Sequence, residues 1–340
     1  MSLELEAVTV VFRGNGRRPV PAVVEVTLQV ERGQVVGLVG ESGSGKSSLG
    51  KAAVGLLRPT SGCVRFNGKP VSAIGRRARP SSQLGLQMVL QNPFESLNPR
   101  RTVGNQIKDA MRASHLSKRL QDARLSQLLG VLGLAPDTAG KFPHQFSGGQ
   151  RQRVAVARAL AASPSMLILD EPFASLDASA QAQLANVLRV LADEEQVGML
   201  VISHDLAIVR HIADRIAVMY LGTIVESGVA SDVWSSALHP YTEALIGAIP
   251  KVDGRGALPI ALPGEIADPA NPPSGCRFHP RCPHAFAVCQ VDSPVLIEAS
   301  PGRNVACWLR HPDEAVRASG ADGEADSDAS SDEMLGRDSV

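Results

Sequence analysis

The sequence contains, at residues 40–47, the glycine-rich segment Gly40-Glu41-Ser42-Gly43-Ser44-Gly45-Lys46-Ser47. An apolar run from Val35 to Val39 precedes it and is typical of a buried parallel strand, while Ser47 to Leu57 is expected to form a helix. The glycines allow the backbone to curl so that consecutive N–H groups point at phosphate oxygens, and the start of the helix favours the same negative charge. The segment therefore predicts a phosphate-binding loop at the carboxyl edge of an α/β sheet.

Individual side chains of this loop have predicted roles. Lys46 should reach the β- and γ-phosphates of a nucleotide, and the Ser47 hydroxyl should ligate magnesium. Ser42, Ser44 and Ser48 complete the expected binding set. A glycine-rich structural turn is the alternative, but the strand and helix that flank the loop favour nucleotide binding. The loop does not separate kinases, GTPases and ATPases, although no Asn-Lys-x-Asp segment that would read guanine occurs.

Two adjacent carboxylates follow a second apolar run, Met166 to Leu169. At the end of a buried strand, Asp170 can hold magnesium while Glu171 faces the γ-phosphate and polarises the attacking water. The alternative is a helix cap beside a solvated acid, since Pro172 follows. Gln91 is a candidate sensor of magnesium and of the water, although a lone glutamine before Asn-Pro is more often a turn residue.

A second anion-binding site is predicted at Ser147-Gly148-Gly149-Gln150. The two glycines expose N–H groups at the start of a helix expected from Gln150 to Ala162, and Ser147 is expected to cap that helix. One γ-phosphate does not need two such cradles within one small domain. We therefore interpret the second cradle as closing over ATP that a partner molecule holds.

Composition limits the class of protein. The chain has 340 residues, 44% hydrophobic residues and a mean hydropathy of +0.01, which suit a soluble protein of about two domains. No apolar run approaches the roughly 18 residues that span a bilayer, and the first residues lack signal-peptide features, so we expect the cytosol. Residues 313–340 contain nine acidic and two basic residues and are expected to be disordered. The remaining positive charge is too diffuse to predict nucleic-acid binding.

Taken in order, these motifs resemble those of the ATP-binding-cassette superfamily. The resemblance identifies a Walker A loop, a Q-loop, a signature motif, a Walker B strand, a D-loop and a switch histidine, at Gly40 to Ser47, Gln91, Phe146 to Gln150, Leu167 to Glu171, Ala174 to Asp177, and His204. It implies an α/β fold with a RecA-like core, an antiparallel β subdomain and a helical signature subdomain.

The same resemblance implies a head-to-tail dimer, in which ATP lies between the Walker A loop of one subunit and the signature motif of the other. Asp177 would then act in trans together with Ser147 to Gln150, and His204 would contact the γ-phosphate. Phe12 lies where the family has an aromatic residue that stacks on adenine, although it could equally belong to the core.

Three segments are similar to the ATPase subunits of bacterial oligopeptide and dipeptide importers, a branch that includes nickel and other small-solute members: Gln91 to Arg100, His144 to Arg153 and His239 to Thr242. The similarity implies a peripheral subunit at the cytoplasmic face of the membrane. Its expected partners are two membrane-spanning permease subunits, a second ATPase subunit in a favoured heterodimer and, indirectly, an extracytoplasmic solute-binding protein. The alternative is a non-transport cassette ATPase, of the DNA-repair or regulatory iron-sulfur kind, but residues 51–145 lack the heptads of a long coiled coil.

Four of the five cysteines lie in a proline-rich C-terminal region: Cys276, Cys282, Cys289 and Cys307. In a cytosolic protein such a cluster favours a metal site over disulfides. The spacing lacks the C-x2-C knuckle of many zinc sites, and the importer family includes subunits with a 4Fe-4S cluster on similarly placed cysteines. The resemblance therefore favours 4Fe-4S over zinc or over packed thiols without metal.

The predicted organisation has three parts. Residues 1–235 form the nucleotide-binding domain, residues 236–312 a small irregular module with the cysteines, and residues 313–340 the acidic tail. Within the first part we expect a helical stretch over residues 105–132 and a hairpin that turns at Gly222.

Overall fold

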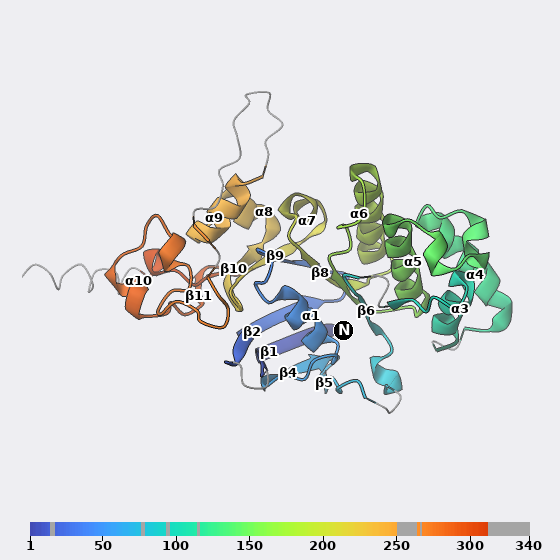
Figure 1. Cartoon of the computed structure of the whole chain (residues 1–340), viewed down its shortest axis with the longest axis horizontal. Helices are drawn as coiled ribbons and strands as arrows, with labels where there is room; N and C mark the ends of the chain where they lie inside the picture. Colours follow the sequence, from blue (N-terminus) through green and yellow to red (C-terminus); the bar gives the residue numbers. More distant parts are fainter. Residues whose placement is uncertain are drawn as a thin grey trace, which may run out of the picture.

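The computed structural model describes most of the chain, namely residues 1–13, 18–75, 79–92, 96–113, 116–249, 264–265 and 267–311. The predicted acidic tail, residues 313–340, lies outside the described residues, as does 250–263 in the proline-rich region. Figure 1 shows the arrangement of the elements.

A mixed eight-stranded sheet forms the centre of the molecule, with strand order β11-β12-β10-β9-β3-β8-β7-β6. Its five parallel strands are β6 (Leu86–Val89), β7 (Met166–Asp170), β8 (Gly198–Ser203), β3 (Val35–Val39) and β9 (Arg215–Tyr220). Every residue of β3, β7 and β8 is buried, which agrees with the apolar runs that predicted these strands. The order brings the carboxyl ends of β3, β7 and β8 side by side.

Both faces of this sheet are covered. Neighbouring residues of a strand point to opposite sides, so each strand packs against both layers. Leu167 and Leu169 pack with the helices of the signature region, whereas Met166 and Ile168 pack with the N-terminal strands and the first helix. The parallel strands are therefore buried on both faces of the sheet.

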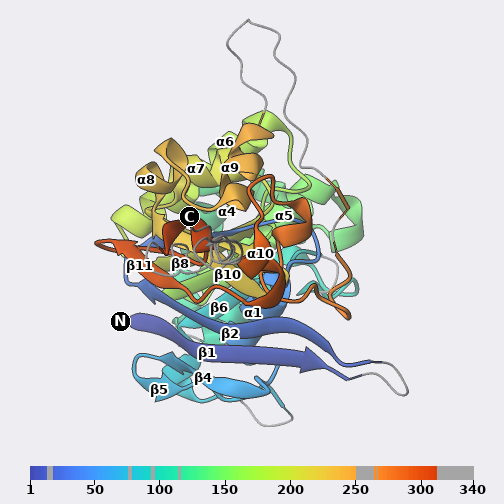
Figure 2. The ribbon, with the colours of Figure 1, turned by 90° about the vertical axis from the view of Figure 1, so that its left-hand side faces the viewer.

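A second, antiparallel sheet has the order β2-β1-β4-β5 and consists of β1 (Ser2–Phe12), β2 (Val20–Glu31), β4 (Ser61–Phe66) and β5 (Lys69–Pro70). Figure 2 shows it as a layer at the bottom of the view, on the other side of the molecule from α6 to α9. The antiparallel β subdomain implied by the resemblance is present.

The helices of the cassette are α1 (Lys46–Ala53), α3 (Val103–Ala113), α4 (Lys118–Val131), α5 (Gly148–Ala161), α6 (Ala178–Asp193), α7 (Leu206–Ile212) and α8 (Ala230–Ser235). The expected helical stretch over 105–132 is two helices, because the chain is extended at Ser117, the N-cap of α4. α1 is shorter than expected and ends before Val54. The predicted hairpin is confirmed: β9 pairs with β10 (Thr223–Val229) around Gly222, which has a positive φ of 89°.

The C-terminal region adds α9 (Pro240–Gly247), α10 (Ala287–Val291), β11 (Ile297–Ser300) and β12 (Arg303–Val305). β12 pairs with β10, and β11 with β12, so this region extends the central sheet at one edge. Tyr220 of β9 and Tyr241 of α9 pack with Phe278 in a shared core. Among the residues described, no helix combines the length and the apolar character that a membrane span needs.

Candidate nucleotide site

The glycine-rich loop connects β3 to α1, the context predicted from the sequence. Gly40 has φ 150°, and a Cβ there would lie 2.1 Å from the carbonyl oxygen of Met219. Gly45, the N-cap of α1, has φ 103°, and its Cβ would lie 2.0 Å from the carbonyl oxygen of Ala22. Any larger residue at either position would have to displace backbone atoms. These two glycines therefore fix the path of the loop against β2 and β9.

Lys46 follows the loop and folds back over it. Its Nζ donates hydrogen bonds to the carbonyl oxygens of Gly40 at 2.8 Å and Glu41 at 2.7 Å. Burial lowers the pKa of Lys46, and the nearby carboxylates of Glu171 and Asp170 oppose that shift. The lysine is thus held at the inner wall of the site, where a phosphate can replace its carbonyl partners.

Asp170 ends β7 and meets the start of α1. Its Oδ1 accepts a hydrogen bond from Ser47 Oγ at 2.9 Å, and the residue is 1% exposed. Burial raises the pKa of Asp170, whereas the hydrogen bond from Ser47 opposes that shift. A hydroxyl and a carboxylate oxygen side by side are a donor pair that suits Mg²⁺, so the residues present fit the ion that the sequence predicts.

Glu171 faces His204, which follows β8. The Oε2 atom of Glu171 lies 2.9 Å from Nδ1 of His204. The backbone of Glu171 has φ 52°, which is unusual for a residue other than glycine, and its N–H donates to the carbonyl oxygen of Ile202 at 2.9 Å. The Glu171 side chain is 10% exposed and that of His204 63%. The backbone thus turns the carboxylate out of the sheet and toward the histidine.

One cavity of about 570 Å³ brings together most of the predicted nucleotide-binding residues. Its lining contains Phe12, Ser42, Gly43, Ser44, Gly45, Lys46, Ser47, Ser48, Gln91, Glu171 and His204. Gly40 and Asp170 lie directly behind this wall. Phe12 is 44% exposed at the end of β1, so it is available to a ligand rather than packed in the core. The volume is in the range of small-molecule sites.

A second cavity of about 330 Å³ contains the predicted in-trans set: Ser147, Gly148, Gly149, Gln150 and Asp177. Ser147 caps α5, as predicted: its Oγ accepts from Gln150 N at 3.3 Å, and Gln150 Oε1 accepts from Ser147 N at 3.1 Å. Asp177 caps α6 by accepting from Ala180 N at 2.8 Å. Two helix N-termini therefore face one cavity that shares no lining residue with the first.

Sequence reasoning missed several residues at these sites. Pro269 lines the first cavity, and Gly133 and Arg153 line the second. Arg281, which lies between Cys276 and Cys282 in the sequence, forms an ion pair with Glu41 of the loop, with its guanidinium 2.7 Å from the carboxylate. Arg153 ends the segment His144 to Arg153 quoted above, but nothing in that segment predicted its place in the second cavity. The other residues belong to no local motif, and only the folded chain brings them to the sites.

The four C-terminal cysteines lie in one part of the C-terminal region: the N–H of Cys276 donates to the carbonyl oxygen of Cys289 at 2.9 Å, and Cys276 and Cys282 pack against the same core. The other three cysteines raise the pKa of Cys307, although burial is the larger cause. Burial raises the pKa of Cys276 and of Cys307 to about 11. Across the described residues, however, the His, Cys, Asp and Glu side chains form no group of three that could hold a metal ion. The predicted 4Fe-4S ligand set is therefore not seen as an assembled metal site among the described residues.

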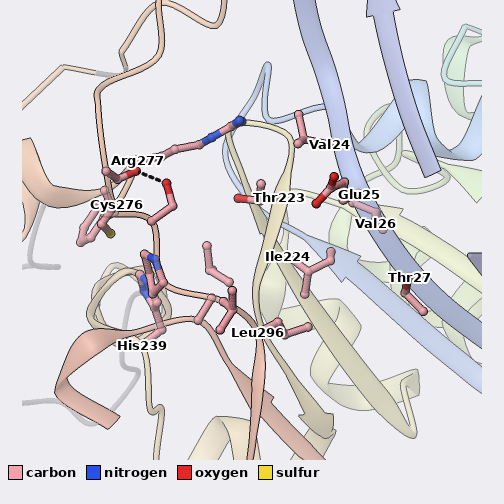
Figure 3. Close-up of a pocket in the computed structure, with 17 residues that line it drawn as sticks. Val24, Glu25, Val26, Thr27, Thr223, Ile224, His239, Cys276, Arg277 and Leu296 are labelled. Atoms are coloured by element: carbon pink, nitrogen blue, oxygen red, sulfur yellow. Dashed lines mark hydrogen bonds between the residues drawn. The ribbon is translucent and has the colours of Figure 1, made fainter. Parts of the chain in front are cut away.

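A third cavity, of about 490 Å³, lies between β2, β10 and the C-terminal region. Figure 3 shows Cys276 and His239 on one side of it and Val24 to Thr27 of β2 on the other, with Thr223 and Ile224 between them. None of the predicted nucleotide-binding residues lines this cavity.

Known proteins are similar to this chain over most of its length. The model of the ABC transporter family matches residues 23–174, and that of the oligopeptide/dipeptide transporter C-terminal region matches residues 225–289. The chain is 43% identical to the oligopeptide transport ATP-binding protein AppF of Bacillus subtilis over 295 residues, which is 85% of this chain and 90% of that protein. It is 44% identical to a probable peptide ABC transporter ATP-binding protein of Sinorhizobium fredii, over 88% of this chain and 86% of that protein.

Solved structures show the same fold. A dimeric ATP-binding cassette in a post-hydrolysis state, bound to ADP and Pi, superposes with a TM-score of 0.61 at 26% identity, over 67% of this chain and 98% of that one. An ATP-binding subunit of an ABC transporter superposes with a TM-score of 0.59, over 69% of this chain and 92% of that one.

Proposed function

The chain belongs to the ABC transporter ATP-binding proteins of the oligopeptide transport type, and from this membership we propose that it binds and hydrolyses ATP to power the import of peptides across a membrane. The observation that carries the ATPase proposal is the single cavity in which Lys46, Glu171 and His204 meet. The peptide proposal rests on the names of the relatives and on the match to the C-terminal region of oligopeptide transporters.

In the proposed reaction, the loop holds the triphosphate through its backbone N–H groups and the ammonium of Lys46. Ser47, Asp170 and Gln91 would hold Mg²⁺, which neutralises phosphate charge when it is bound. Glu171 accepts a proton from the attacking water, and His204, 2.9 Å from its carboxylate, keeps that carboxylate oriented. Phe12 offers an exposed ring for stacking on adenine.

The signature residues complete the site of a second subunit. Ser147, Gly148 and Gln150 are exposed at the start of α5, where their polar groups can meet a nucleotide held by another molecule. The proposed assembly is therefore a pair of ATPase subunits at the cytoplasmic face of a membrane, below two permease subunits. We favour a heterodimer, with an extracytoplasmic solute-binding protein that delivers the peptide.

Purification from gently solubilised native membranes tests this assembly. The full chain should be recovered with two polytopic membrane proteins and a second cassette subunit, and the associated binding protein should identify the solute. A matched preparation of the soluble fraction serves as the control. Recovery from the soluble fraction alone, without membrane proteins, would contradict the proposed importer but not the proposed ATPase activity. It would favour the alternative of a non-transport cassette ATPase.

We further propose the four C-terminal cysteines as ligands of a 4Fe-4S cluster, which would require a thiol arrangement that the described residues do not form here. Four thiols in one small region, with the N–H of Cys276 donating to the carbonyl oxygen of Cys289 at 2.9 Å, are a donor set that suits an iron–sulfur cluster and support this proposal. Protein prepared without air should show iron and sulfide in the ratio of the cluster together with its visible absorption. Cys289→Ser should remove both, whereas Cys63→Ser, outside the set, should not. Iron-free protein from anaerobic cells would contradict the proposal.

A further inference from the structure

The phosphate-binding loop is attached to the C-terminal region through Glu41, the residue after its first glycine. The carboxylate of Glu41 accepts from Arg281 Nη1 at 2.7 Å and from Nη2 at 3.0 Å, a two-pronged pairing that fixes orientation as well as distance. The side chains are 17% and 4% exposed, so solvent screens this pair only weakly. Arg281 is 240 residues away in the sequence.

A second contact from the C-terminal region holds the backbone of the same residue. The N–H of Glu41 donates to the Tyr241 hydroxyl at 2.8 Å. Tyr241 is fully buried, with its ring centroid 4.6 Å from that of Tyr220 and 5.3 Å from that of Phe278. The hydroxyl is therefore set in a rigid aromatic cluster. On the other side, the carbonyl oxygen of Glu41 accepts from Lys46.

Glu41 introduces a negative charge into a loop that must accept a triphosphate. Without a cation beside it, this carboxylate would repel the phosphates and would be free to swing toward them. The guanidinium of Arg281 neutralises the charge and holds the carboxylate on the outer side of the loop. The pairing thus keeps the inner side of the loop electropositive.

Arg281 is also tied to the cysteines. It ends the 3₁₀ turn His279–Arg281, and Cys282 follows directly. The N–H of Cys282 donates to the carbonyl oxygen of His279 at 3.2 Å, and that of His279 to the carbonyl oxygen of Cys276 at 3.0 Å. A displacement of the segment from Cys276 to Cys282 would therefore also displace the guanidinium.

We propose that Glu41, Arg281 and Tyr241 form a clamp through which the cysteine-bearing segment positions the phosphate-binding loop and thereby sets its affinity for ATP. The clamp rests on the proposed ATPase function and adds a regulatory input to the same site. Neither Arg281 nor Tyr241 lines the ATP cavity, so both are positioning residues. Their loss should alter ATP binding rather than the chemical step.

Arg281→Met in the full chain tests the clamp through the Kd of a fluorescent ATP analogue. We expect Kd to rise about tenfold, because a partly buried carboxylate is left unpaired beside the phosphates. The kcat of the assembled importer should change by less than about twofold while KM rises, since Glu171 and His204 are untouched. Glu41→Gln combined with Arg281→Met should recover most of the affinity, because the unpaired charge is then gone.

A second buried ion pair provides the control. Arg303 Nη2 lies 2.8 Å from Glu226 Oε1 and joins β12 to β10 without contacting the loop. Arg303→Met should lower the thermal unfolding temperature but leave Kd unchanged. If Arg281→Met prevents folding, Tyr241→Phe removes only the hydroxyl and should still raise Kd by about threefold.

Four outcomes are decisive. A folded Arg281→Met or Tyr241→Phe chain with wild-type Kd would overturn the clamp, and so would an equal rise in Kd from Arg303→Met. An increase confined to the clamp variants, reversed in the double variant, would support it. Failure of the wild-type chain to bind the analogue would instead contradict the proposed ATPase function.

Discussion

Glu171→Gln should abolish nearly all ATP turnover while ATP binding is kept. The glutamine amide has the size of the carboxylate and can still pair with His204, but it cannot accept a proton from the attacking water. Loss of a general base typically lowers a rate by about 10²- to 10⁴-fold. Lys46 and Ser47, which we assign to phosphate and Mg²⁺ binding, are unchanged, so the variant should stay in the ATP-bound closed pair.

Phosphate release by the assembled importer and retention of labelled ATP after gel filtration would measure the two effects separately. Glu25→Gln is a suitable control, because Glu25 also has a positive φ, 49°, and is exposed on β2 outside the ATP cavity. Turnover near the wild-type rate in Glu171→Gln would assign the base to another group. Loss of ATP binding would show that Glu171 contributes to the ground-state complex.

Most of the residues predicted to bind nucleotide line one cavity, and they could be grouped from the sequence because most of them belong to one short loop. The conformation of this eight-residue loop depends mainly on its own residues. Gly40 and Gly45 have positive φ angles and lie too close to backbone oxygens for a larger residue to fit. The parallel strands were equally predictable, since each is a short and fully buried apolar run. The start of α5 at Ser147 was also predictable, because a serine followed by two glycines and Gln150 is a local helix-capping signal.

What the sequence did not predict depends on contacts between distant segments. Arg281 has no pattern that assigns it to Glu41, and Pro269 carries no mark of its position in the ATP cavity. The pairing of β12 with β10 joins two short strands that are far apart in the sequence, and neither has a sequence pattern that predicts its partner. The break between α3, which ends at Ala113, and α4, which begins after Ser117, was missed because the sequence on both sides of the break has a helical pattern.

Ser147→Arg should impair hydrolysis of the ATP held by the second ATPase subunit, while this chain still binds its own ATP. Ser147 is exposed at the mouth of the cavity in front of α5, remote from the lining of the first cavity. An arginine there would fill the space into which the opposing nucleotide must enter. Loss of the cap costs about 1 kcal/mol, which is too little to unfold the chain.

The two sites can be distinguished by photo-labelling each ATPase subunit with azido-ATP and measuring phosphate release by the assembled importer. We expect labelling of this chain to be retained and turnover to fall at least about tenfold, because closure of the pair is blocked. Ser117→Arg is the matched control: Ser117 is an exposed N-cap of α4 that makes no capping hydrogen bond. Loss of labelling on this chain itself would mean that Ser147 acts on the ATP of its own subunit. Turnover at the wild-type rate would show that the segment Ser147 to Gln150 has no role in ATP hydrolysis. Only retained labelling together with reduced turnover would show that each ATP site is built from the first cavity of one subunit and the second cavity of the other.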